Sequence, residues 1–365
     1  MNHLGNWKNG ELGDFVTLKR GFDLPQQKRE DGQVPIFSSS GITGTHSTAM
    51  VKAPGVITGR YGTIGEVFYA AKDFWPLNTT LFVEDFHGND AKFIYYFLKT
   101  LEWSKFTSAS AVPGINRNTV HKEIVSLPDI ETQRRIASTL SMFDEKIKIN
   151  TEINDNLLDQ AQTLYKQHFP YSVQDDLPDG WRIGTVGEII EIHDSKRIPL
   201  SGADRMKMEK KIYPYYGAAS LMDYVDNYIF DGKYLLLGED GTVVDDAGYP
   251  ILQYVWGQFW VNNHAHILTG RLGFNVESLY MLFKQTPVKS IVTGAVQPKI
   301  SQANLRSVQV VIPPEHNLKE YNDLVEPLFS LLRANEEECK SLAALRDTLL
   351  PKLMSGEIDV SAVQL

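Results

Sequence analysis

The chain has 365 residues, of which 42% are hydrophobic and 22% charged, and its formal net charge is -9. This is ordinary globular composition, and the length is enough for two domains with cores of their own. One cysteine, Cys339, excludes an internal disulfide framework. Because the sequence has neither a signal-like N-terminus nor an apolar stretch of about 18 residues, we expect a cytoplasmic protein without a membrane span.

The negative charge is unevenly distributed along the chain. The net charge is +1 for residues 1–128, -4 for 129–178, -1 for 179–313 and -5 for 314–365. Phosphate binding needs local positive charge. Residues 1–128 and 179–313 are nearly neutral and contain basic clusters, so the overall negative charge does not exclude a nucleic-acid partner.

Residues 1–128 combine short strand-like runs, such as 55–58 and 80–83, with glycine-rich turns and an amphipathic helix over 91–101. Residues 179–313 repeat this order. Gly59 and Gly238 are 179 residues apart, and Ile115 and Ile300 are 185 apart. The drifting offset predicts one scaffold used twice, with loops of different length between its elements.

A long helix is predicted after each copy. The first runs from about Ile130 to His168, roughly 57 Å at 1.5 Å per residue. Its apolar positions alternate four and three residues apart and are interrupted by Asn150 and Asn154, as in a heptad seam. Adding 185 gives a matching seam with Asn335 at the place of Asn150. We expect the two seams to pack on each other with asparagines fixing the register; the alternative is that each helix packs on its own domain with solvated asparagines.

Motifs for catalysis are weak. Asp179, Glu209 and Lys211 fit a loose metal-dependent nuclease pattern, but Glu209 lies in a polar run that is typical of a solvated basic loop. His264 and His266 share one face of a strand, where a partly buried pair is the simpler interpretation than a metal site. No phosphate loop, dinucleotide motif or methyltransferase catalytic loop occurs in the sequence.

Several loops have the composition of surfaces that bind DNA, with cations for phosphates, polar side chains for base edges and glycines for close approach. The candidates in the first copy are Lys19, Arg20, Lys28, Arg29, Ser39, Ser40, Thr45, His46, Arg60, Tyr61, Asn116 and Arg117. Those in the second copy are Lys196, Arg197, Lys207, Lys210, Lys211, Tyr216, Asn262, Asn263, Gln297 and Lys299. Their occurrence in both copies favours a protein that reads two sites.

The order of several landmarks resembles the specificity (S) subunits of type I restriction-modification systems over nearly the whole chain. These landmarks are Trp7 to Gly13, Val34-Pro35-Ile36-Phe37, Gly59-Arg60-Tyr61-Gly62, Phe74-Trp75-Pro76-Leu77-Asn78, Ile124 to Pro128 followed by Glu131-Thr132-Gln133-Arg134-Arg135-Ile136-Ala137, and Leu349 to Ile358. Residues 314–320 depart from the pattern because they lack the Gln-Arg pair of the first helix.

The resemblance implies an α+β fold with two α/β target recognition domains separated by two long antiparallel helices that form a coiled coil, with an internal pseudo-two-fold repeat. The domains would be 1–128 and 171–313 (with a linker), and the helices 129–170 and 314–365 (with a C-terminal tail). It also implies a non-catalytic subunit that reads a bipartite sequence in double-stranded DNA. Alternatives are a metal-dependent endonuclease and a coiled-coil scaffold that binds proteins.

The resemblance further implies partners and their contact sites. Two methyltransferase subunits, which carry S-adenosylmethionine, would dock on the helices, and restriction subunits would join them; this chain would bind no cofactor or metal itself. The residues that would form the subunit interface are Gln133, Arg134, Ile136, Phe143, Leu328, Leu332 and Leu349.

Overall fold

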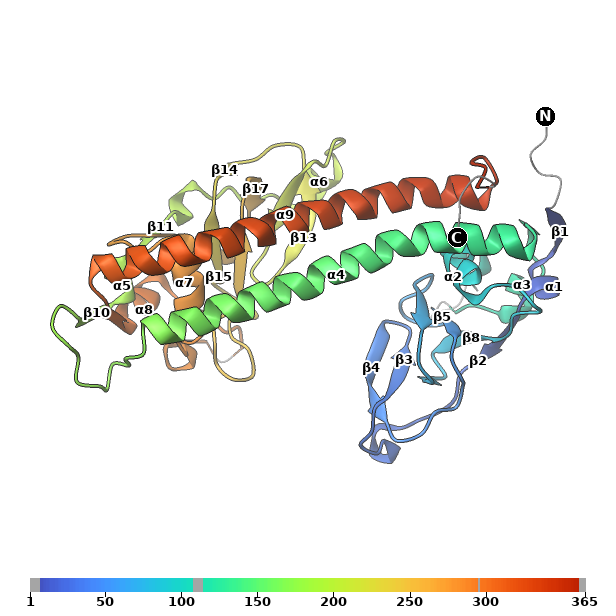
Figure 1. Cartoon of the computed structure of the whole chain (residues 1–365), viewed down its shortest axis with the longest axis horizontal. Helices are drawn as coiled ribbons and strands as arrows, with labels where there is room; N and C mark the ends of the chain where they lie inside the picture. Colours follow the sequence, from blue (N-terminus) through green and yellow to red (C-terminus); the bar gives the residue numbers. More distant parts are fainter. Residues whose placement is uncertain (1–6, 108–113, 295, 361–365) are drawn as a thin grey trace. The chain divides into compact units, whose positions relative to one another are not determined.

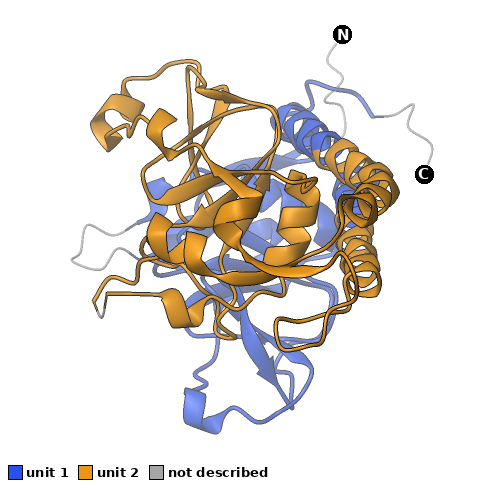
Figure 2. Ribbon diagram, turned by 90° about the vertical axis from the view of Figure 1, so that its left-hand side faces the viewer, with its two compact units in different colours: residues 1–150, 337–365 blue, residues 151–336 orange. Residues whose placement is uncertain are grey.

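The computed structural model describes residues 7–107, 114–294 and 296–360. It divides into two compact units, shown in Figure 2. Unit 1 comprises Met1–Asn150 and Glu337–Leu365, and unit 2 comprises Thr151–Glu336. The long helices α4 (Ile130–His168) and α9 (Glu315–Met354) each contribute one stretch to each unit. In the part of the chain that the structure describes, no helix is long and apolar enough to cross a membrane.

Unit 1 is built on a four-stranded antiparallel sheet with the order β2-β8-β5-β6 (Figure 1). A second sheet has the order β4-β3-β7, and β1 pairs with β9. The remaining elements of this unit are β1 Lys8–Glu11, β2 Thr17–Arg20, β3 Val34–Ser38, β4 Gly41–His46, β5 Gly55–Gly59, β6 Val67–Ala70, β7 Trp75–Pro76, β8 Thr80–Asp85, β9 Ile124–Leu127, α1 Leu12–Phe15, α2 Ala91–Lys99 and α3 Arg117–His121.

Unit 2 repeats this topology and adds one edge strand, β14, to its second sheet. Its sheets have the orders β11-β18-β15-β16 and β13-β12-β17-β14, and β10 pairs with β19. The elements are β10 Arg182–Thr185, β11 Ile190–Ile192, β12 Tyr213–Tyr216, β13 Leu221–Val225, β14 Phe230–Asp231, β15 Tyr234–Gly238, β16 Leu252–Val255, β17 Gln258–Val261, β18 Ala265–Gly270, β19 Gln309–Ile312, α5 Val186–Ile189, α6 Gly202–Met206, α7 Val276–Phe283 and α8 Gln302–Ser307. The internal repeat predicted from the sequence is therefore confirmed.

The core of unit 1 combines the sheet, α2 and both long helices. Asp90 caps α2 by accepting a hydrogen bond from the Phe93 amide, which turns Phe93 and Phe97 toward the core. Leu353 and Val360, from the end of the chain, belong to the same core. Each buried side chain of this size contributes about 1.5–3 kcal/mol. Residues separated by more than 300 positions thus complete one core.

The core of unit 2 also includes both long helices. Ala161 and Tyr165 of α4 and Tyr321 and Val325 of α9 are buried in it. The Tyr321 hydroxyl donates to the Ala161 carbonyl at 3.0 Å. Each helix therefore packs on its globular neighbour as well as on the other helix.

The two seams pack antiparallel within each unit, as expected. In unit 2, buried Asn154 donates to the Leu332 carbonyl at 3.2 Å and accepts from Asn335 Nδ2 at 2.8 Å. In unit 1, Cys339 Sγ contacts the Ile147 carbonyl at 3.7 Å. This pair is the Asn154–Leu332 pair shifted by 185, with the two helices exchanged. The predicted register therefore holds in the contacts themselves.

The asparagines at equivalent positions have different partners. Asn335 bonds Asn154 in unit 2, whereas Asn150 donates to Glu338 Oε2 at 2.7 Å in unit 1. All three asparagines are buried. The alternative with solvated asparagines is therefore wrong. The four-part division of the chain proposed from the sequence remains a prediction.

Candidate nucleic-acid interface

Several residues that the sequence predicted to contact DNA gather around one hollow in unit 1. They come from the end of β2, the turn after β5 and the start of α3: Lys19, Arg20, Arg60, Tyr61, Asn116 and Arg117. The hollow has a volume of about 580 Å³, and Leu81, Gly114, Ile115 and Asn118 complete its lining. The structure brings these residues together, while their contact with DNA stays a prediction.

Backbone pairing fixes the walls of this hollow. The Ile115 amide donates to the Arg60 carbonyl at 3.0 Å, and Tyr61 forms a bridge with Gly114. A Cβ on Gly114 would lie 2.2 Å from the Tyr61 ring, so only glycine allows this approach. Asn116 caps α3 by accepting from the Asn118 amide at 3.0 Å.

The lining of the hollow carries four cations, Lys19, Arg20, Arg60 and Arg117, and the first two are paired with acids. Lys19 pairs with Glu84 at 2.5 Å, and Arg20 lies 3.8 Å from Asp23. The Arg60 guanidinium lies over the Tyr61 ring, 4.5 Å from its centroid, and makes no ion pair with any residue that the structure describes. Cation–π stacking orients this guanidinium but leaves its N–H groups available to an anion.

The other predicted residues of unit 1 lie on or near the β3–β4 hairpin. Lys28, Ser40 and Thr45 are exposed there, and Arg29 and Ser39 are half-buried. His46 is 5% exposed, and its Nδ1 accepts from the Glu30 amide at 3.0 Å. We leave His46 out of the proposed DNA surface, because its ring is buried and bonded to the backbone.

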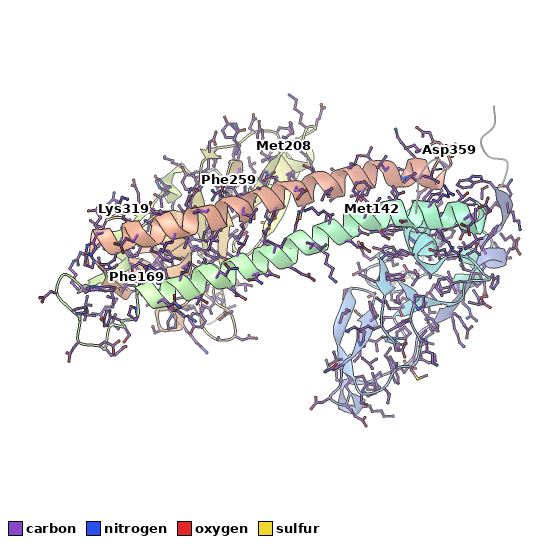
Figure 3. All side chains as sticks on the ribbon, viewed as in Figure 1. Met142, Phe169, Met208, Phe259, Lys319 and Asp359 are labelled. Atoms are coloured by element: carbon purple, nitrogen blue, oxygen red, sulfur yellow. The ribbon has the colours of Figure 1, made fainter. Side chains whose placement is uncertain are left out.

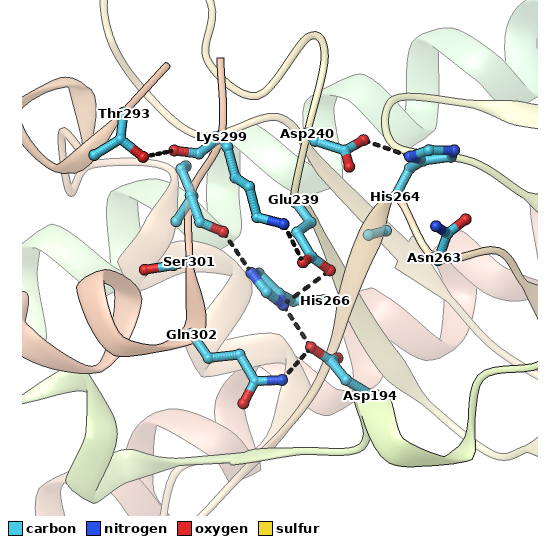
Figure 4. Close-up of polar contacts among 12 residues, drawn as sticks. Asp194, Glu239, Asp240, Asn263, His264, His266, Thr293, Lys299, Ser301 and Gln302 are labelled. Atoms are coloured by element: carbon cyan, nitrogen blue, oxygen red, sulfur yellow. Dashed lines mark hydrogen bonds and ion pairs between the residues drawn. The ribbon is translucent and has the colours of Figure 1, made fainter. Parts of the chain in front are cut away.

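In unit 2, the predicted residues Arg197 and Lys299 belong to a network of charges. Figure 4 shows Lys299 in this network beside Glu239, His266, Asp194 and Gln302. Arg197 NH1 donates to Glu239 Oε2 at 2.6 Å and to the Ala265 carbonyl at 2.8 Å. Lys299 Nζ lies 3.2 Å from Glu239 Oε1. Arg197 is 14% exposed at its side chain, whereas Lys299 is 48% exposed. Lys299 therefore stays in the proposed DNA surface. Arg197 is left out of it, because its guanidinium is held by contacts inside the protein.

His266 is the buried centre of this network. Its Nδ1 lies 2.6 Å from Asp194 Oδ2, and its Nε2 lies 2.8 Å from the Ile300 carbonyl. A carbonyl only accepts hydrogen bonds, so Nε2 donates to Ile300, and Nδ1 is within hydrogen-bond distance of the Asp194 carboxyl. Gln302 also donates to Asp194, at 2.6 Å.

The acids of the network are ionised despite their burial. Burial by itself raises the pKa of Asp194, but hydrogen bonds from His266 and the Ile267 amide, with the charges of His266 and Arg197, outweigh it and hold this pKa below its ordinary value. Burial likewise raises the pKa of Glu239, and Arg197, His266 and Lys299 together lower it.

Asp194, Glu239 and His266 place ligand-type atoms within 4.8 Å of one another. The two carboxylates already bind Arg197, Lys299 and Gln302, and both His266 nitrogens have hydrogen-bond partners within the protein, so we interpret the group as an ion-pair network rather than a metal site. Sequence reasoning missed Asp194 and Glu239, and the only signal was the pair of histidines. The predicted histidine pair is partly buried, since His266 is fully buried and the side chain of His264, which bonds Asp240, is 43% exposed. Their placement on one strand is wrong, because His264 lies in the turn before β18.

The remaining predicted residues of unit 2 are dispersed. Lys196, Lys207, Lys210, Lys211, Asn263 and Gln297 are exposed, and Tyr216 is half-buried. Lys211 pairs with Asp223 at 3.4 Å. Asn262 is 4% exposed, and its Oδ1 accepts a hydrogen bond from the His264 amide at 2.8 Å. This side chain therefore stabilises its own loop and is buried away from a ligand.

The nuclease interpretation finds no support in the described residues. The Glu209 amide is tied with its neighbours to the Asp226 carboxylate. Among the described residues, the group with metal-ligand spacing includes neither Asp179 nor Glu209.

Three of the seven residues predicted for the subunit interface are buried inside the chain. Gln133 is 2% exposed, donates to Asn89 and the Pro128 carbonyl, and accepts from the Asp90 amide. Ile136 and Leu332 are also buried. The others are exposed Arg134, paired with Glu131, and half-buried Phe143, Leu328 and Leu349. Gln133, Ile136 and Leu332 therefore do not enter our proposed partner surface.

The model of the type I restriction modification DNA specificity domain matches residues 5–159 and again residues 178–343. The chain belongs to this family. The double match coincides with the repeat seen in the two units. The role of this chain is DNA-binding specificity in a type I restriction-modification system.

Relatives in this family are similar over most of the chain. The MjaIX specificity subunit of Methanocaldococcus jannaschii is 23% identical over 75% of this chain and 70% of its own length. A putative type I specificity subunit of Mycoplasma pneumoniae is 27% identical, with 97% of each chain covered. The crystal structure of an S subunit from M. genitalium has the same fold, with a TM-score of 0.61 at 20% identity over 97% of each chain.

Proposed function

We propose that this specificity subunit reads a bipartite DNA sequence, with one half-site bound by each unit, and that it has no catalytic activity. The observation that carries the proposal is the cationic hollow of unit 1, which collects predicted residues from three separate loops. Its guanidinium and amide groups suit phosphates and base edges. A repeated unit in one chain suits a target with two parts.

We propose further that the catalytic groups come from partners. Two methyltransferase subunits, which bind S-adenosylmethionine, would dock on the long helices, and restriction subunits would join the complex. In this proposal the chain binds no cofactor itself. Its cytoplasmic location remains a prediction.

Exposed apolar side chains on the helices support this docking. In unit 1, Met142 (labelled in Figure 3) and Ile149 of α4 are 56% and 50% exposed, and Leu345 of α9 is 47% exposed. Exposed apolar side chains that recur along a helix are typical of a contact surface for another protein. These residues replace the buried ones suggested by the sequence.

The test is to co-express the chain with the methyltransferase of its own system and to map methylated adenines across a genome. We expect a motif of two half-sites with a fixed gap. Replacing residues 179–313 by those of another specificity subunit should change one half-site alone. A motif without two parts contradicts the proposal, and an unchanged motif after the replacement favours a protein-binding scaffold.

A further inference from the structure

The hollow of unit 1 and the ion-pair network of unit 2 occupy the same place in the repeated fold. In unit 1 the Ile115 amide donates to the Arg60 carbonyl, and in unit 2 the Ile300 amide donates to the Glu239 carbonyl at 2.8 Å. The bridge Tyr61–Gly114 likewise corresponds to the bridge Asp240–Lys299. The backbone therefore equates Arg60 with Glu239 and Gly114 with Lys299.

Strand pairing extends this correspondence. Arg20 is opposite Leu81 across β2 and β8. In unit 2, Asp194 follows β11 and bonds both His266 and the Ile267 amide of β18. The repeat thus places Asp194 at the position of Arg20 and His266 at that of Leu81.

The start of the following helix completes the set. Arg117 and Gln302 are the first residues of α3 and α8, and both follow the equivalent residues Ile115 and Ile300 by two positions. Three arginines of unit 1 (Arg20, Arg60 and Arg117) therefore correspond to two carboxylates and an amide in unit 2.

The exchange of residues changes what the place can hold. In unit 2, Asp194 and Glu239 are neutralised by the chain's own Arg197, His266 and Lys299, so the place is filled from within. In unit 1, the described lining contains cations and amides but no carboxylate, and the space is open, although Glu84 and Asp23 outside the lining pair with Lys19 and Arg20. Converging guanidinium groups around an open space, without a carboxylate in the lining, are suited to a phosphate.

We propose that the hollow of unit 1 is a binding subsite for one phosphate of the DNA backbone, and that unit 2 lacks this contact because its own carboxylates occupy the place. The proposal rests on the proposed function. It means that the two units hold their half-sites by different phosphate contacts even though they share one fold.

The experiment measures DNA binding by the complex of this chain with its methyltransferase between 50 and 200 mM salt. Each phosphate contact adds about 0.9 to the slope of log K against log salt. Arg60→Gln and Arg117→Gln should each reduce the slope by up to about one contact, which makes the loss of affinity over this range about 3.5-fold smaller. Arg60→Glu, which introduces the residue of unit 2, should weaken binding further.

The matched control is Lys99→Gln, which removes one exposed positive charge of unit 1 outside the lining of the hollow. We expect its slope to equal that of the wild type. A second arm replaces single phosphates of the first half-site by neutral methylphosphonates. One position should weaken binding of the wild type and have no further effect on Arg60→Gln.

Three results would overturn the proposal. The first is an Arg60→Gln slope equal to that of Lys99→Gln. The second is an unchanged slope with a relaxed base preference at one half-site, which makes Arg60 a base contact. The third is micromolar binding of inorganic phosphate by the full chain that is lost in Arg60→Gln, which makes a free phosphate the ligand. The methylation motif keeps two half-sites in all three, so failure of the proposed function remains distinguishable.

Discussion

Replacing His266 by leucine, the residue at the equivalent place in unit 1, should destabilise unit 2 strongly. The side chain is fully buried, and its two ring nitrogens contact Asp194 and the Ile300 carbonyl. Removing one partner of a buried charge pair costs about 3–5 kcal/mol. Asp194 keeps its bonds from Gln302 and the Ile267 amide, so we expect the lower end, about 3 kcal/mol.

The matched control is His264→Leu. His264 lies two residues away and also contacts an acid, Asp240, but its side chain is 43% exposed. An exposed ion pair contributes about 0–1 kcal/mol. The control should therefore lose at most about 1 kcal/mol.

The assay is urea unfolding, together with hydrogen exchange of peptides from β18, which reports the opening of unit 2 by itself. Adding Asp194→Asn to the His266→Leu variant should recover part of the lost stability, since the uncompensated charge is then gone. Equal losses for the two histidine variants, or fully additive losses for His266→Leu and Asp194→Asn, would refute the coupling of His266 to Asp194.

Three further predictions follow from the helices and the network. Asn335→Leu should lower the free energy of unfolding in urea by about 1–3 kcal/mol, because Asn154 Oδ1 loses its buried donor. Adding Asn154→Leu should lower it by much less than a second such amount, and additive losses would contradict the Asn335–Asn154 hydrogen bond. Folding lowers the pKa of Asp194, so this carboxylate contributes its full stabilisation above its ordinary pKa of about 3.9 and loses it as the pH falls through the lower folded pKa. The difference in free energy of unfolding between wild type and Asp194→Asn should therefore narrow in acid. A difference that stays constant with pH would refute this prediction. Met142→Glu should weaken co-purification with the methyltransferase without changing the unfolding midpoint, whereas unchanged co-purification would remove Met142 from the docking surface.

Local patterns predicted the helices well. The bounds of α4 were visible because Pro128 precedes it, Pro170 follows it and a heptad seam connects them. The asparagines could be assigned to a buried seam from their spacing alone. Which partner each one contacts depended on the antiparallel alignment, and this gave Asn150 a glutamate rather than an asparagine.

The candidate site was only partly visible in the sequence. Arg60 and Arg117 could be named as basic loop residues, but their convergence depends on a backbone pairing between residues more than 50 positions apart. The partners of His266 lie 72 and 27 positions before it, so no local period indicates them. Gln133 was assigned to a subunit interface from a motif, whereas its amide orders the start of α2.

The shared core of unit 1 dictates an order of events during synthesis. Residues 1–150 are translated before unit 2, yet their core lacks Leu353 and Val360 until translation has passed unit 2. Unit 2 is continuous from Thr151 to Glu336 and has all of its residues earlier. Domains usually finish folding from the N-terminus onward. Here we expect the second unit to complete its core before the first, and translation that stops short of residue 350 to leave one complete unit beside another with an open apolar core.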